Sequence, residues 1–170
     1  MALILACFLV MACVSGSGLA ADPVQTANKD MTGENMNGDK MGPFARGEIN
    51  PYGKYFKGQT YLNMLTKDGV SIGNVTFEPA SRNNWHIHHA DKNGGQILLC
   101  TYGRGWYQEW GKPALEMREG DVVVIPQGVK HWHGAAKDSW FTHLAVEVPG
   151  ENAHTEWLEP VSDDDYEKLT

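Results

Sequence analysis

The sequence predicts an all-β domain, an antiparallel sandwich or barrel, behind a separate N-terminal region. Its 170 residues suit one domain with short appendages, and two complete domains are not expected. From residue 44 onward, short runs rich in Val, Ile, Tyr, Trp and Thr follow one another, separated by Gly, Pro, Asn or Asp. Many short strands at close spacing are typical of antiparallel architectures.

Nine segments have the composition of strands: Thr60–Leu65, Ser71–Glu78, Asn84–His88, Gln96–Thr101, Gly105–Trp110, Ala114–Met117, Asp121–Ile125, His131–Ala135 and Phe141–Val148. One helix is expected near the end of the chain, where Ser162 can cap residues 163–169 with Asp165 three positions further on. The pattern contains no internal repeat.

Residues 1–20 predict a signal peptide. Residues 2–14 form an unbroken apolar run of 13 residues, and small residues around Gly18 and Ala20 follow it, as in the apolar region and cleavage site of an exported protein. The run is too short to span a bilayer. Cys13 offers a lipoprotein site as an alternative, and a buried strand is another. We therefore expect a periplasmic or extracellular protein, free or lipid-anchored.

Composition changes at both ends of the predicted domain, residues 44–170. Residues 21–43 have no period of 2 or 3.6 and predict a flexible linker. The formal net charge is −7, and residues 151–170 carry seven acidic side chains against one lysine, which predicts a solvated surface helix. Because no basic stripe is present, nucleic-acid binding is not expected.

Cys100 is the single cysteine beyond the predicted signal peptide, which excludes an internal disulfide in the mature domain. It lies in the apolar run 96–100, so we expect a buried structural thiol.

Six of the seven histidines gather in two short segments and the strand that follows them: His86, His88, His89, His131, His133 and His143. Residues two apart on a strand face the same side, so His86 can converge with His88, and His131 with His133. Imidazole suits Zn, Mn, Fe, Co and Ni, and facing strands can bring two pairs to one ion. The two pairs together predict a metal site, although either pair by itself would be interpreted as two surface side chains without a function.

The spacing around these histidines resembles the cupin superfamily. The second cupin motif is matched by Gly120, Pro126, Gly128 and His131, with Ala135 in place of its terminal Asn. The first motif is matched more loosely, by Ala80 at a glycine position, His86, His88, Gln96 at a carboxylate position, and Gly103. This resemblance implies a single-domain double-stranded β-helix of the jelly-roll type, here with a short C-terminal helix.

Residues 44–166 resemble, more narrowly, the small single-domain cupins related to bacterial manganese-dependent hydroxynitrile lyases, often described as carboxymuconolactone decarboxylase-like. Six segments carry this resemblance: Asn74–Pro79, Trp85–His88, Gly95–Leu98, Gly103–Trp106, Lys130–Ala135 and Thr142–Ala145. In that group two His, a Gln and a third His bind a divalent metal. Carried over, the metal ligands are His86, His88, Gln96 and His131, and the ion is manganese, with Fe, Zn or Ni as alternatives.

Seven residues separate His88 from Gln96, which is more than in these relatives. The pair Gly94-Gly95 can turn the chain so that Gln96 faces inward. Asp91 or His89 in the longer loop is the alternative ligand.

Three neutral imidazoles and a neutral amide leave the charge of a divalent ion in place, which favours Lewis-acid chemistry over redox cycling. His133 and His143 are not needed as ligands in this set, so they are candidates for proton transfer. The alternative for each is a structural role, in which the ring is hydrogen-bonded to the backbone. Several aromatic residues either fill the core or line the mouth of a pocket for a small aromatic or apolar carbonyl compound: Trp85, Trp106, Tyr107, Trp132, Trp140 and Phe141.

The resemblance implies a lyase-like enzyme that acts on a small carbonyl or hydroxy compound and forms a homodimer. A metal-dependent dioxygenase or decarboxylase cupin is one alternative, because fold and metal do not fix the reaction. A non-catalytic cupin that binds a small molecule and is stabilised by its metal is another.

Overall fold

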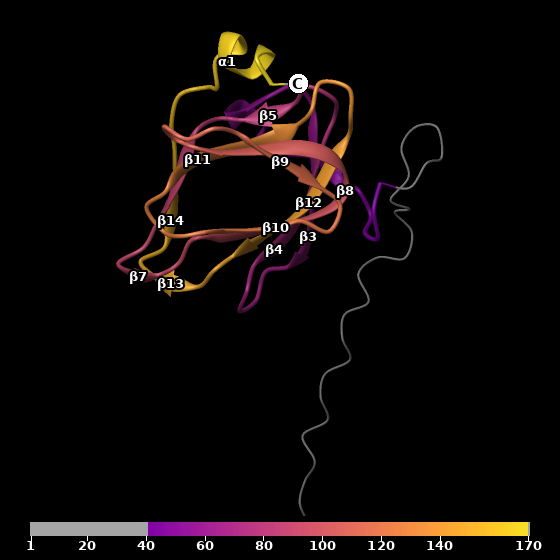
Figure 1. Ribbon diagram of the computed structural model, residues 1–170. Helices are drawn as coiled ribbons and strands as arrows, with labels where there is room; N and C mark the ends of the chain where they lie inside the picture. Colours follow the sequence, from indigo (N-terminus) through magenta and orange to yellow (C-terminus); the bar gives the residue numbers. More distant parts are fainter. Residues whose placement is uncertain (1–40, 170) are drawn as a thin grey trace, which may run out of the picture.

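The computed structural model describes residues 41–169, which form two antiparallel sheets that face each other, with one short helix outside (Figure 1). The predicted signal peptide, Cys13 and residues 21–40 of the predicted linker lie outside the described residues. The prediction of an all-β barrel of antiparallel strands with a short C-terminal helix is confirmed.

The first sheet has the order β1-β3-β4-β12-β8-β10: β1 Glu48–Ile49, β3 Thr60–Thr66, β4 Ile72–Phe77, β12 Phe141–Glu147, β8 Gln96–Glu109 and β10 Val122–Ile125. The second sheet contains the other half of β8 with β2 Phe56–Lys57, β5 Arg82–Asn83, β6 His86–His89, β9 Leu115–Arg118, β11 Lys130–Ala135 and β14 His154–Trp157. A separate pair joins β7 Lys92–Asn93 to β13 Gly150–Glu151, and a 3-10 turn, η1, covers Gly53–Tyr55.

Strand β8 corrects the expectation of two separate strands at 96–101 and 105–110. It is one strand of 14 residues that passes from the first sheet into the second. The change of sheet occurs around Gly103, whose φ is 74°. A Cβ atom there would lie 1.9 Å from the carbonyl oxygen of Trp140, so only glycine fits this bend.

The other predicted strands are present with small shifts of their ends, and the predicted strand 84–88 corresponds to β6, which begins at His86 and ends at His89. Arg82 and Asn83, just before that segment, form the short strand β5, which was not predicted. Strand β14 was not predicted, because its residues are mostly exposed and lie in the acidic C-terminal stretch. This strand pairs with the edge of β6 that does not face β11, so the histidine segment lies between β11 and β14.

The interior between the sheets is filled by alternate residues of their strands. Leu98 and Cys100 of β8 face inward together with Phe77, Met117 and Phe141, and all five are buried. Cys100 is a buried free thiol, as predicted, and burial raises its pKa to about 11.

Helix α1, Asp163–Glu167, lies outside the second sheet (Figure 1). Ser162 caps it as predicted, because its Oγ accepts from the backbone N of Asp165 at 3.1 Å. The acidic side chains point outward, but Tyr166 is buried and donates to the carbonyl oxygen of Ala135 at 2.6 Å. The segment is therefore anchored to the barrel and is not a freely solvated helix. Within residues 41–169 no helix is long and apolar enough to cross a membrane.

Candidate metal centre

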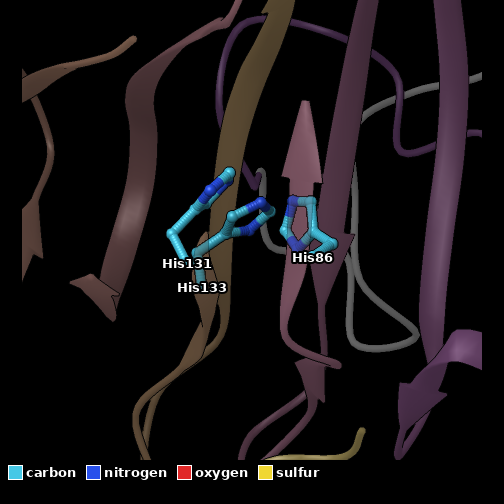
Figure 2. A group of neighbouring side chains, drawn as sticks. All are labelled: His86, His131 and His133. Atoms are coloured by element: carbon cyan, nitrogen blue, oxygen red, sulfur yellow. The ribbon is translucent and has the colours of Figure 1, made fainter. Parts of the chain in front are cut away.

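Three histidines from two neighbouring strands meet between the sheets (Figure 2). His86 lies on β6, directly opposite His131 of β11 in the strand register, and His133 follows two residues later on the same face. All three are buried, and one nitrogen of each lies within 4.8 Å of the others. The ring of His88 lies next to this cluster, with its centroid 5.2 Å from that of His86.

A cavity of about 310 Å³ opens onto this cluster. Its polar lining includes Asn83, His86, His88, Gln96, His133 and Glu147, and much of the remaining wall is apolar. The aromatic residues at the cavity are Tyr52, Phe56 and Trp157. The six aromatic residues named from the sequence do not line this cavity, and the core alternative holds for five of them. Trp85, Trp106 and Trp132 pack beneath α1, and Tyr107 and Phe141 fill the core. Trp140 stacks on Tyr61.

His86 and His131 have the same hydrogen-bonding pattern. The Nδ1 atom of His86 donates to the carbonyl oxygen of Asn84 at 3.0 Å, and the Nδ1 atom of His131 donates to that of Val129 at 2.9 Å. Because a neutral imidazole carries one proton, the Nε2 atom of each ring is left with a free lone pair. The Nε2 atom of His131 is buried without any partner.

His88 and Gln96 are both held by Glu147. One carboxylate oxygen, Oε2, lies 3.1 Å from Nδ1 of His88, and the other, Oε1, accepts from Nε2 of Gln96 at 2.6 Å. The Nε2 atom of His88 and the Oε1 atom of Gln96 are both buried with no partner. Buried acceptors of this kind are costly unless something binds them, and three imidazole nitrogens with an amide oxygen are suitable ligands for a divalent metal.

His133 lies within the cluster, yet both its nitrogens are engaged. The Oδ1 atom of Asn83 accepts from the backbone N of His133 at 2.9 Å, which fixes the amide, and its Nδ2 atom then donates to Nε2 of the ring at 3.0 Å. The ring proton must therefore lie on Nδ1, from which it is donated to Nε2 of His143 at 3.1 Å. By distance alone, His133 belongs with His86 and His131 in a group that could hold a metal ion. The hydrogen bonds instead favour His88 and Gln96 as ligands, because these two residues have acceptor atoms without partners.

Burial keeps these rings neutral. It lowers the pKa of His131 and of His143 to about 4, and it lowers the pKa of His86 and His133 well below the ordinary value. A neutral ring is the form that binds a metal or accepts a proton.

Glu147 is affected by two opposing influences. Burial raises the pKa of its carboxyl, but the hydrogen bonds from His88 and Gln96 outweigh burial and hold the pKa below its ordinary value.

The two alternative ligands lie away from the cavity. His89 points to the surface, where its Nε2 atom pairs with Glu156 at 2.7 Å. Asp91 is exposed and accepts from Asn152. The longer loop after His88 therefore runs outside the site, and Gln96 at the start of β8 is buried beside the histidines.

Sequence reasoning missed Asn83, Glu147 and Trp157. Glu147 could have been found, because His143, Ala145 and Glu147 alternate on one face of β12. Trp157 stacks on His86 with the ring centroids 4.7 Å apart, but β14 itself had not been predicted. No local signal marks Asn83, since its role depends on the facing strand.

A jelly-roll barrel with a buried histidine cluster on its inner face defines a protein of the cupin class. No known family profile matches the chain. The chain is 41% identical over 99 residues to (R)-mandelonitrile lyase of Granulicella tundricola, an alignment that covers 58% of this chain and 72% of that protein. The chain belongs to the cupin superfamily, and its relative is a cupin hydroxynitrile lyase.

Solved structures agree with this assignment. A cupin-like protein from Thermotoga maritima superposes with a TM-score of 0.65 at 38% identity, over 75% of this chain and 96% of that one. A protein with a double-stranded β-helix domain from Klebsiella pneumoniae superposes with a TM-score of 0.51 at 16% identity, over 70% of this chain and 91% of that one. The second likeness shows the fold alone.

Proposed function

We propose that this protein is a metal-dependent lyase that cleaves a small neutral α-hydroxynitrile into a carbonyl compound and hydrogen cyanide. The observation that carries the proposal is a set of buried acceptor atoms without partners: Nε2 of His88 and Oε1 of Gln96, which line the cavity, and Nε2 of His131, whose ring packs against that of His86. The Nε2 atom of His86 is likewise left as an acceptor. The 41% identity to a mandelonitrile lyase supports the same reaction. Manganese is the ion we propose.

In the proposed reaction, the bond between the carbinol carbon and the nitrile carbon breaks, and its electron pair leaves with cyanide. The hydroxyl oxygen becomes the carbonyl oxygen, its proton passes to a base, and the cyanide takes a proton to leave as hydrogen cyanide. A divalent ion held by His86, His88, Gln96 and His131 would supply a Lewis acid for the substrate oxygen. The side chains of the protein must supply the base and the cavity surface that binds the substrate.

His133 is the base in this proposal. It lines the cavity and is neutral because burial holds its pKa low. Its Nε2 lone pair accepts from Asn83, so the substrate hydroxyl has to replace that bond when it transfers its proton. The Nδ1 proton can then move to His143, which lies 3.1 Å away, so that the positive charge is shared between two rings.

The cavity walls favour a small aromatic or apolar substrate. Its volume of about 310 Å³ lies at the lower end of small-molecule sites. Tyr52, Phe56 and Trp157 give it an aromatic side. Leu62 and Val75 extend the apolar surface.

The test is metal analysis of the purified protein, followed by assays of aromatic cyanohydrin cleavage. We expect about one divalent ion per chain, its loss in His131→Ala, and release of the aldehyde by the loaded wild type. A protein that carries no ion after reconstitution would overturn the metal site. A loaded protein that releases no aldehyde and no cyanide would overturn the lyase assignment.

Export and a homodimer remain predictions. Edge strand β10 exposes Val122 and Val124, with 56% and 67% of their surface accessible, and we propose this edge as the contact for a second copy. Sedimentation of the purified protein would check the homodimer, and cell fractionation would check export.

A further inference from the structure

Glu147 is the last residue of β12, and its side chain reaches two proposed ligands that come from different strands. Its backbone lies directly opposite Gln96 of β8, while His88 belongs to β6. We propose that Glu147 is a positioning residue that fixes the proton of His88 on Nδ1 and turns the amide oxygen of Gln96 toward the metal site. The inference rests on the ligand set proposed above and adds the residue that makes two of those ligands competent.

An ionised carboxylate accepts hydrogen bonds and cannot donate them. Facing Oε2 of Glu147 at 3.1 Å, the Nδ1 atom of His88 must carry the ring proton. Facing Oε1 at 2.6 Å, the amide of Gln96 must present its NH2 group. The two remaining atoms, Nε2 of His88 and Oε1 of Gln96, are therefore acceptors, and both are buried without partners.

Among residues 41–169, no other neighbour of His88 imposes this arrangement. The hydroxyl of Thr155 lies 3.2 Å from the same Nδ1 atom, but a hydroxyl can either donate or accept and so tolerates both tautomers. Glu147 is thus the group that excludes the tautomer in which His88 carries its proton on Nε2. With that tautomer, the ring could not bind a metal through the atom that faces the site.

An amide at position 147 would face a conflict that the carboxylate avoids. Its NH2 group would lie against either the Nδ1 proton of His88 or the NH2 group of Gln96. Relief requires the His88 tautomer to change or the Gln96 amide to turn, and each change removes one ligand atom from the site. Glu147→Gln keeps the size of the side chain and alters this pattern together with the charge, and the ¹⁵N NMR measurement below reports the pattern separately from the charge.

The negative charge of Glu147 has a second consequence. The four proposed ligands are neutral, but a carboxylate hydrogen-bonded to two of them offsets part of the charge of a divalent ion. Glu147 also lines the cavity, so an anionic substrate would be repelled there. The site therefore fits a neutral hydroxy compound better than a carboxylic acid.

The experiment compares the wild type, Glu147→Gln and the control Glu156→Gln. Glu156 makes a similar carboxylate contact with His89, but at the surface and outside the cavity. Two quantities are measured: the affinity for Mn²⁺, from the electron paramagnetic resonance signal of the free ion, and the His88 tautomer, from ¹⁵N NMR of the metal-free protein. The NMR spectra are recorded at about pH 8, above the ordinary pKa of imidazole. Circular dichroism verifies that each variant is folded.

We expect Glu147→Gln to bind Mn²⁺ about 10- to 100-fold more weakly and to show His88 protonated at Nε2 in part or in full, or the amide of Gln96 reoriented. Glu156→Gln should match the wild type in both measurements. Wild-type Mn²⁺ affinity in Glu147→Gln, or unchanged His88 and Gln96 resonances, would overturn the positioning role. If the wild type itself binds no metal, the proposed function fails, while the NMR comparison still decides how Glu147 acts.

Discussion

The Nδ1 atom of His133 lies 3.1 Å from the Nε2 atom of His143, and the two buried rings stand almost perpendicular to each other. No carboxylate contacts this pair within the described residues. Asn83 fixes the direction in which protons are donated, from the amide to His133 and from His133 to His143. His133 is therefore close to the proposed metal ligands in space but belongs, by its hydrogen bonds, to a different chemical unit.

This distinction predicts different outcomes for two neighbouring histidines. His131→Ala should lose the metal, because its Nε2 atom has no other partner. His133→Gln should keep about one ion per chain yet cleave a cyanohydrin about 100-fold more slowly or worse, since it lacks the proposed base. Mass spectrometry of the metal content and steady-state kinetics check both. Loss of the ion in His133→Gln would instead place His133 among the ligands.

Stability should fall in mild acid because of His143. Burial lowers its folded-state pKa to about 4, whereas the unfolded chain titrates near the ordinary value of about 6.5. Between these pH values the unfolded state binds more protons than the folded state. The free energy of unfolding therefore has its full value above about pH 6.5 and decreases as the pH falls toward 4. The expected slope is up to about 1.4 kcal/mol per pH unit for this group, measured by urea unfolding.

The control is His143→Gln, which can still accept from His133 through its amide oxygen but does not titrate. Its stability should depend less on pH over the same window. An unchanged slope in this variant would show that His143 does not account for the acid sensitivity.

Ala80 occupies the glycine position of the first cupin motif and has a φ of 66°. A side chain in this left-handed region is strained, and glycine is not. Ala80→Gly should therefore stabilise the protein by about 0.5–1 kcal/mol, after allowing for the greater freedom of glycine in the unfolded chain. Ala114→Gly, at a position without positive φ, should destabilise it. Equal losses in both variants would contradict the strain argument.

Trp157 should determine the preference for aromatic substrates. Its ring stacks on the rings of His86 and Tyr55, with the centroids 4.7 Å away in both cases, and it lines the cavity. Trp157→Leu should lower kcat/KM for an aromatic cyanohydrin about 10-fold, and less for a small aliphatic one. Trp110→Leu is the control, because Trp110 is exposed and lies outside the cavity. A uniform decrease for both substrates would argue against a specificity role.

Much of the site was accessible from the sequence because the signals are local. The spacing of His86 and His88, and of His131 and His133, places each pair on one face of its strand. The Gly-Pro-Gly-His spacing of the second motif identified the cupin fold, and Gly94-Gly95 indicated that Gln96 could turn inward. The same local pattern divided β8 wrongly, since Gly103 reads as a break and acts as a bend within one strand.

What the sequence by itself determined is the fold class, the two histidine pairs and the capped C-terminal helix, all of which depend on neighbours a few residues apart. Only the tertiary structure decided which nitrogen is free on His88 and on His133, and which end of the Gln96 amide faces the site. That choice depends on partners from distant strands: Asn83 for His133, and Glu147 for both His88 and Gln96. A histidine side chain is the same in every sequence, but its single ring proton goes to the nitrogen whose neighbour accepts it, and the strand register sets that neighbour.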